Sequence, residues 1–328
     1  MNIIVQKFGG TSVSTEDRRK QVAVKVKEAI DNGFTPIVVV SAMGRKGQPY
    51  ATDTLLTLID DKFKESNRNS KDLLMCCGEI ISSVVVANAL YNEGIQAVPL
   101  TGGQAGIITD DNFCEAEYIS IDIDRLLSVV REGKVPVVTG FQGITKDGYF
   151  TTLGRGGSDT TACILGNAVN AKEIEIYTDV DGIMTADPRI VEDASLIDEI
   201  TYNEVFQLAD QGAKVIHPKA IDLAKKGNIP LFIKNTMGES KGTLVSNNTI
   251  GNERRYITGI TYLNNRIQVR IRLSENSNIK VYQNLLEILA KNHISLDLIN
   301  IFPAHQFFTV DKSEKENVSS ILDLVGIK

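Results

Sequence analysis

Two glycine-rich segments of the sequence carry charged side chains suited to phosphate and carboxylate groups. The first is Lys7-Phe8-Gly9-Gly10-Thr11-Ser12, which follows an apolar run and precedes a helical pattern. Glycines let a backbone approach a ligand closely and point N–H groups at it, and a helix N-terminus favours anions. With the Lys7 ammonium beside them, these residues predict a phosphate cradle, although a tight strand-to-helix turn would use the same residues.

The second segment, Thr152–Thr161, places an arginine among three glycines and then opens a helix with good N-cap residues. The guanidinium of Arg155 can hold a carboxylate through two parallel hydrogen bonds. The amides of Gly156, Gly157 and Ser158 can receive an anionic group. We interpret this segment as functional, because an arginine surrounded by glycines is rarely needed for folding alone.

Two familiar nucleotide-binding signatures are missing from the sequence. There is no G-x-x-x-x-G-K-[ST] run, which excludes a P-loop enzyme. In the second segment Asp159 stands where the last glycine of G-x-G-x-x-G would be. A dinucleotide-binding Rossmann domain is therefore poorly supported.

An α/β domain must position these segments, because short β-branched runs alternate with longer helical patterns. The predicted strands are Asn2–Phe8, Pro36–Ala42, Ile95–Leu100, Val135–Gly140, Glu173–Asp179 and Ile229–Lys234. The predicted helices are Glu16–Asn32, Lys71–Asn92, Ile123–Glu132, Ser158–Asn167 and Tyr202–Lys226. We expect a mostly parallel sheet sandwiched by helices, with ligands at the carboxyl ends of the strands.

A polar linker rich in Gly, Ser and Asn, Gly238–Arg255, is predicted to divide the chain. We expect a catalytic domain over residues 1–245 and a small α+β domain over residues 256–328. The elements expected in the second domain are strands Ile257–Tyr262 and Ile267–Leu273, helix Val281–Lys291, strands Ile294–Phe302 and Gln306–Asp311, and helix Glu314–Leu324. The sequence stops where a closing strand would follow, so this domain is predicted to be incomplete.

The composition is that of a two-domain globular protein of 328 residues, 42% of them hydrophobic. A net charge of −6 gives no basic field for a polyanion, so nucleic acid is not expected as a partner. The N-terminus lacks a signal-peptide pattern, and the longest apolar stretch, near Ile80–Ala89, is too short for a membrane span. Four cysteines without a C-x-x-C pair and three histidines predict free thiols and no metal site. We expect a cytoplasmic protein.

Further motifs follow in one order along the chain. Besides the two glycine-rich segments they are Val40-Ser41-Ala42-Met43-Gly44, Cys77-Gly78-Glu79, Thr101–Gly106, Gly140-Phe141-Gln142-Gly143, Tyr177–Gly182, Thr185–Arg189 and Gly212–Pro218. This series closely resembles the aspartate kinases of the amino-acid kinase superfamily. The resemblance covers residues 1–250, and the order of the motifs is far more specific than any one of them.

The resemblance implies transfer of the γ-phosphoryl group of ATP to the β-carboxylate of L-aspartate. The product would be 4-phospho-L-aspartate, at the start of lysine, methionine and threonine biosynthesis. A carboxylate is already ionised at neutral pH, so the reaction needs no general base and depends on positioning and charge neutralisation.

The catalytic pair that the resemblance implies is Lys7 and Asp159. Lys7, with the segment Phe8, Gly9 and Gly10, would hold the β- and γ-phosphates of ATP, and Asp159 would orient the lysine. The alternative for Asp159 is a simple carboxylate at a helix start.

The expected aspartate site combines Arg155, for a substrate carboxylate, with Glu79, which resembles the family residue that recognises the substrate amino group. Glu79 interrupts an apolar helical face, where an unpaired charge would be costly. Its alternative is a solvated or capping glutamate. The remaining substrate contacts that we expect are Ser41, Thr52, Gly156, Gly157 and Ser158.

The expected nucleotide contacts lie later in the chain. Thr178 and Asp179 would read a ribose or adenine edge at the end of a strand, and Arg189 and Lys214 resemble the family's phosphate and nucleotide contacts. Met184 stands where many relatives carry tyrosine, so a ring-stacking contact is not assured. Mg²⁺ is expected through ATP phosphates and water, without a dedicated protein site.

Residues 266–328 resemble one ACT regulatory module, where the family normally carries two. The expected assembly is a homo-oligomer, with a dimer formed through the ACT region or the catalytic domain. Two alternatives stay open: another amino-acid kinase, acting for example on acetylglutamate or glutamate, and a catalytically silent ligand-sensing relative.

Overall fold

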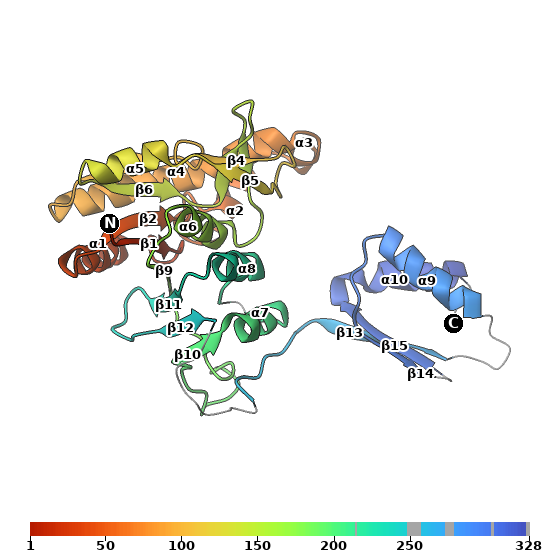
Figure 1. The fold of residues 1–328 in the computed structure, drawn as a ribbon. Coiled ribbons are helices and arrows are strands. Elements are labelled where there is room, and N and C mark those ends of the chain that lie inside the picture. The colour runs from red at the N-terminus through yellow and green to blue at the C-terminus, as the bar shows by residue number, and fades with distance from the viewer. Residues whose placement is uncertain (214, 248–256, 273–278, 303–304, 326–328) are drawn as a thin grey trace. The chain divides into compact units, whose positions relative to one another are not determined.

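The chain forms two compact units in a computed structural model, Met1–Thr261 and Tyr262–Lys328 (Figure 1). The structure describes residues 1–213, 215–247, 257–272, 279–302 and 305–325. The two units are described separately below.

The first unit is built on an eight-stranded sheet in the order β10-β12-β11-β9-β1-β2-β6-β3. The strands are β1 (Ile3–Phe8), β2 (Thr35–Val40), β3 (Ala97–Leu100), β6 (Val135–Thr139), β9 (Glu173–Thr178), β10 (Glu199–Thr201), β11 (Leu231–Asn235) and β12 (Thr243–Ser246). All neighbouring pairs are parallel except β11 with β12. The predicted α/β fold with a mostly parallel sheet is confirmed.

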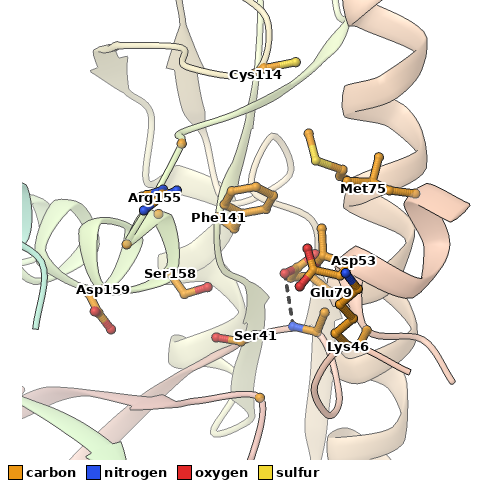
Figure 2. A pocket seen from close by; sticks show the side chains of 18 of the residues that line it. Ser41, Lys46, Asp53, Met75, Glu79, Cys114, Phe141, Arg155, Ser158 and Asp159 are labelled. Carbon is orange, nitrogen blue, oxygen red and sulfur yellow. Dashed lines mark hydrogen bonds between the residues drawn. The ribbon is translucent and has the colours of Figure 1, made fainter. Parts of the chain in front are cut away.

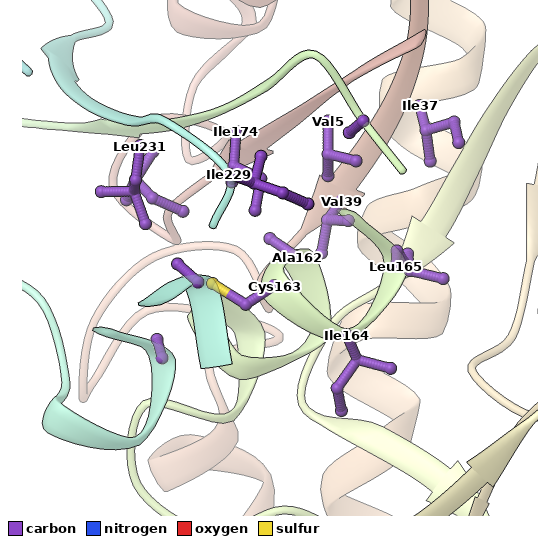
Figure 3. Close-up of a cluster of buried hydrophobic side chains, with 14 of the residues drawn as sticks. Val5, Ile37, Val39, Ala162, Cys163, Ile164, Leu165, Ile174, Ile229 and Leu231 are labelled. Carbon is purple, nitrogen blue, oxygen red and sulfur yellow. The ribbon is translucent and has the colours of Figure 1, made fainter. Parts of the chain in front are cut away.

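Helices cover both faces of this sheet because its strands are apolar on both sides. Along β2, Val38 and Val40 pack in one cluster with helices α1 (Glu16–Asp31) and α4 (Arg68–Asn92). The alternate residues Ile37 and Val39 pack in another cluster with α5 (Asp124–Arg131), α6 (Gly157–Ala168) and α8 (Pro218–Gly227). Figure 3 shows the second cluster, where α6 lies against the central strands.

A second sheet, which the sequence did not predict, has the order β5-β4-β7-β8. Its strands are β4 (Ile107–Thr109), β5 (Tyr118–Ile121), β7 (Gln142–Ile144) and β8 (Phe150–Thr152). Three short elements before α4 were also not predicted: α2 (Thr52–Leu55), the 3-10 turn η1 (Leu56–Leu58) and α3 (Asp61–Ser66). The strand β8 leads directly into the Gly154-Arg155-Gly156 loop.

Three sequence-based predictions are wrong: one helix, the linker and one strand. The helix predicted over Tyr202–Lys226 is two helices, α7 (Tyr202–Asp210) and α8, because Gly212 adopts a φ of +111° and Pro218 starts a new helix. The predicted linker Gly238–Arg255 contains β12, which pairs with β11 and β10.

The predicted strand Ile257–Tyr262 is not a strand. Residues 257–261 belong to the first unit and bond within it: the Ile260 N–H donates to the Thr185 carbonyl, and the Thr258 hydroxyl donates to the Glu204 carboxylate. No described strand pairs with this segment.

The second unit has a three-stranded antiparallel sheet, β13-β15-β14, and two helices. Its elements are β13 (Arg266–Arg272), α9 (Ile279–Lys291), β14 (Asp297–Phe302), β15 (His305–Asp311), the 3-10 turn η2 (Lys312–Glu314) and α10 (Lys315–Val325). Leu285, Leu289, Phe308 and Ile321 belong to its own core. The predicted β-α-β-β-α order is confirmed, and this α+β unit is consistent with an ACT-like domain.

Helix α4 alone among the described helices is long and apolar enough to cross a membrane by length and composition. Half of that apolar window is buried inside the protein, where Val86 and Leu90 pack against the sheet. The helix also carries buried Asp72 and Glu79. These features are those of a core helix of the domain.

Candidate active site

A pocket of about 700 Å³ opens at the carboxyl ends of β1 and β2 (Figure 2). It brings together ten residues that the sequence predicted for phosphate and substrate binding: Lys7, Gly10, Ser41, Thr52, Glu79, Arg155, Gly156, Gly157, Ser158 and Asp159. These residues come from β1, β2, α2, α4 and the start of α6. The parallel strands place them together because their carboxyl ends share one edge of the sheet.

Two of the pocket-lining residues, Lys7 and Asp159, form an ion pair. The Lys7 Nζ lies 2.6 Å from Asp159 Oδ1, and the two side chains are only 11% and 12% exposed. Lys7 is held in the middle of the sheet by pairing with Val39 of β2 and Ile176 of β9. Asp159 stands in the first turn of α6. The pair therefore presents a fixed, oriented cation to the pocket.

The first glycine-rich segment is a tight turn as well as a pocket wall. A Cβ added at Gly10 would lie 2.5 Å from the Ala42 carbonyl oxygen, so the close approach requires glycine here. Gly10 lines the pocket, whereas the Gly9 N–H donates to the Tyr177 carbonyl. Of the two predicted amides, only that of Gly10 belongs to a pocket-lining residue.

The second glycine-rich segment is shaped by close packing. Gly156 has a φ of +68°, and a Cβ added there would lie 2.2 Å from the Cβ of His217. Gly157 packs in the same way on the ring of Phe141. Between the glycines, Arg155 is exposed to the pocket and forms no ion pair with any described residue. Its guanidinium is therefore available for an anionic ligand.

Glu79 is a buried carboxylate with one oxygen unused. It is 3% exposed, and its Oε1 accepts a hydrogen bond of 3.0 Å from the Ala42 N–H (Figure 2). Its Oε2 is buried and has no hydrogen-bond partner in the described part of the chain. Burial raises the pKa of Glu79 from its ordinary value of 4.5 to about 8. A cationic group in the pocket would satisfy this oxygen and favour the ionised form.

The small hydroxyl residues stand at element ends facing the same space. Ser41 follows β2 and donates its N–H to the Phe8 carbonyl. Thr52 begins α2, and Ser158 lies in the first turn of α6 against Gly140. All three can therefore contact a ligand in the pocket.

Of the residues predicted for ATP, Lys7 and Gly10 line this pocket, whereas the others that the structure describes do not: Phe8, Gly9, Thr178, Asp179, Met184 and Arg189. Phe8 is fully buried and its ring stacks on that of Tyr177, so its side chain packs the core instead of contacting a ligand. Thr178 is half-buried at the end of β9, and Met184 forms an isolated bridge with Leu196.

The charged members of this predicted set pair with neighbours. Asp179 accepts a 2.6 Å contact from the Arg45 guanidinium, and exposed Arg189 lies 2.7 Å from Asp187. Lys214 lies outside the described residues. We call Thr178, Asp179, Met184, Arg189 and Lys214 the nucleotide side, and the pocket around Glu79 and Arg155 the amino-acid side.

Several pocket residues were not predicted from the sequence. They include Arg45, Lys46, Asp53, Leu56, Arg68, Lys71, Met75, Cys114, Glu115 and Phe141. Met75 lies one helical turn before Glu79, and Phe141 stands in a motif already noted, so both could have been inferred. The loop around Cys114 and Glu115 carried no signal. No group of three His, Cys, Asp or Glu residues in the described chain could hold a metal.

Comparisons with known proteins agree with this geometry. The model of the amino acid kinase family matches residues 2–235. Aspartokinase 1 of Bacillus subtilis (strain 168) is 44% identical over 331 residues, which cover 99% of this chain and 82% of that protein.

Two solved structures of E. coli aspartokinase III are similar over nearly the whole chain, each at 27% identity. The complex with lysine and aspartate (T-state) has a TM-score of 0.80 and covers 100% of this chain and 84% of that one. The complex with aspartate and ADP (R-state) has a TM-score of 0.73 and covers 98% and 83%. The chain therefore belongs to the amino acid kinase family and, within it, to the aspartokinases.

Proposed function

We propose that this protein transfers the γ-phosphoryl group of ATP to the β-carboxylate of L-aspartate, giving ADP and 4-phospho-L-aspartate. The observation that carries the proposal is the unpartnered Oε2 of Glu79 in the same pocket as Arg155 and Lys7. An anion and a separate cation suit the ammonium and the α-carboxylate of one free amino acid. The buried Lys7, paired with Asp159, is left for the reacting groups.

The reaction follows from these charges. The Glu79 carboxylate would bind the substrate ammonium and Arg155 its α-carboxylate, so that the β-carboxylate points toward the γ-phosphoryl group. Lys7, held by Asp159, would neutralise charge that spreads over the phosphoryl oxygens in the transition state. The β-carboxylate oxygen attacks phosphorus while the bond to the ADP oxygen breaks. No proton transfer is required, because the attacking carboxylate is already ionised.

Mg²⁺ would reach the pocket on the triphosphate. The described residues contain no carboxylate cluster for it, so its ligands would be phosphate oxygens and water. Its contribution would be to neutralise phosphate charge.

The nucleotide side would hold the rest of ATP. Thr178 ends β9, the strand beside the one that carries Lys7, and Asp179 follows it, while Gly10 precedes α1 at the pocket wall. We propose that Met184, Arg189 and Lys214 complete this contact surface when ATP binds, with Asp179 exchanging its contact to Arg45 for one to the nucleotide.

A different amino-acid kinase would fit this pocket less well. Acetylglutamate carries an amide in place of an ammonium, so the buried Oε2 of Glu79 would gain no cation. A catalytically silent sensor has no evident use for the buried Lys7–Asp159 pair, which keeps a cation oriented toward the phosphate end.

We further propose that the first unit is the catalytic domain and the second an ACT-like regulatory domain in a homo-oligomer. Support for self-association comes from β14, whose residues Leu298, Ile301 and Phe302 are exposed apolar side chains at a sheet edge in the second unit. Four free cysteines are consistent with a reducing cytoplasm.

The test is ATP-dependent formation of the hydroxamate from aspartate and hydroxylamine by the purified protein. We expect product with L-aspartate and none with N-acetyl-L-glutamate or L-glutamate, with coupled ADP detection as an independent readout. Activity confined to acetylglutamate would refute the proposed substrate. No ATP turnover with any of the three acids would refute the proposed reaction.

A further inference from the structure

Asp72 is a fully buried carboxylate outside the pocket that ties three separate segments together. It lies on α4, seven residues before Glu79 and therefore on the same side of the helix. Its Oδ2 accepts hydrogen bonds of 2.9 Å from the N–H groups of Cys114 and Thr152, and its Oδ1 accepts one of 2.8 Å from the Thr152 hydroxyl.

The partners of Asp72 belong to the two loops that face the substrate end of the pocket. Thr152 ends β8, three residues before Arg155, and Cys114 and Glu115 line the pocket themselves. The two loops also bond directly, since the Ala116 N–H donates to the Thr152 carbonyl. Asp72 thus joins α4, which carries Glu79, to the loop that carries Arg155.

The backbone at these contacts requires a strong acceptor. Cys114 is a non-glycine residue with a φ of +76°, a conformation that side chains rarely adopt and that must be held by its surroundings. A buried carboxylate with three donors is also well satisfied, whereas an unpaired one would be costly. The arrangement therefore fixes the two loops at a definite distance from α4.

We propose that Asp72 is a positioning residue for aspartate binding, which sets the spacing between Arg155 and Glu79 without touching the substrate. This inference rests on the proposed function. It predicts a selective effect, because the described residues that donate hydrogen bonds to Asp72, Cys114 and Thr152, lie in the loops of the amino-acid side. Loss of these hydrogen bonds to Asp72 should weaken aspartate binding and leave ATP binding unaffected.

The test compares steady-state kinetics of the parent protein and the Asp72→Asn variant. An amide offers one acceptor oxygen where the carboxylate offers two, so we expect the KM for aspartate to rise about tenfold or more. The KM for ATP should stay within about twofold, as for independent sites. The control Asp17→Asn, at an exposed aspartate of α1, should change neither constant.

A more conservative variant, Thr152→Val, tests the proposal if Asp72→Asn does not fold. Thr152→Val keeps the shape of the side chain and both backbone bonds, and removes only the hydroxyl bond to Asp72. We expect the KM for aspartate to rise about threefold to fivefold, with the KM for ATP unchanged. An unchanged KM for aspartate in a folded Asp72→Asn or Thr152→Val protein, or an equal rise in both constants, would overturn the proposal.

The activity of the parent protein distinguishes a failure of the proposed function from a failure of the proposed role of Asp72. If it forms no phosphorylated product from aspartate, the proposed function fails. If the parent is active and the variants show no selective change, only the role of Asp72 fails.

Discussion

The amino-acid side and the nucleotide side of this active site are built in different ways. On the amino-acid side, buried Glu79 lies on a long core helix and buried Asp72 ties that helix to the Arg155 loop. On the nucleotide side, Asp179 and Arg189 are exposed and form ion pairs with neighbouring side chains. The difference teaches that the residues proposed for the amino acid are fixed by the folded core, whereas the charged residues proposed for the nucleotide are held only by surface ion pairs.

Lys7→Ala should give the largest effect, because Lys7 is the cation that we propose for the transferred phosphoryl group. We expect kcat to fall by about 10³-fold or more, since a preorganised cation at the transition state is lost. The measurement is coupled ADP release at saturating aspartate and ATP, with far-UV circular dichroism to verify folding. Near-normal turnover in a folded variant would remove Lys7 from the catalytic role.

Glu79→Ala tests the amino-acid side alone. We expect the KM for aspartate to rise by about 10²-fold, because the substrate ammonium loses its buried counter-charge. The KM for ATP should change little. An aspartate dependence that matches the parent would show that the ammonium binds elsewhere.

Glu79→Gln tests whether the buried carboxylate of Glu79 lowers the stability of the folded protein. Burial raises the folded-state pKa of Glu79 from 4.5 to about 8, so the folded protein favours the protonated form. The ligand-free parent therefore loses stability as pH rises from about 4.5 to about 8. A glutamine cannot ionise, so the variant should have a Tm a few degrees above the parent near pH 8.5 and a similar Tm near pH 4.5. Equal Tm differences at both pH values would contradict the burial of a charge.

Asp179→Asn should give the smallest effect, and it tests the nucleotide side. The contact between Asp179 and Arg45 is solvent-exposed, and such ion pairs contribute about 0–1 kcal/mol. We expect an unchanged Tm and an unchanged KM for aspartate, with a rise of at most about tenfold in the KM for ATP. A larger change in aspartate binding than in ATP binding would remove the distinction between the two sides.

The residues that the sequence proposed for the amino-acid side follow strong local patterns, and the structure brings them to one pocket. The strand before Lys7 is a run of buried β-branched residues, and the segment around Arg155 combines glycines with N-cap residues. Glu79 stood out as a charge within an apolar helical face. Each of these signals depends on neighbours close in sequence.

The features that the sequence did not predict depend on contacts between distant residues. The strands of the second sheet are only three or four residues long, too short for a period-two pattern to be recognised. The bonds of Asp72 connect residues 42 and 80 positions apart. The division of the predicted helix at Tyr202–Lys226, in contrast, could have been inferred from Gly212 and Pro218.

Proton release on aspartate binding tests the central claim most directly. Titration calorimetry of the nucleotide-free protein near pH 7, in buffers of different ionisation enthalpy, measures protons released per ligand bound. Burial raises the pKa of Glu79 to about 8, so Glu79 would have to ionise in order to pair with the substrate ammonium as proposed. We predict release of about one proton per aspartate by the parent and almost none by Glu79→Gln. The same proton release from both proteins, or none from either, would contradict the account.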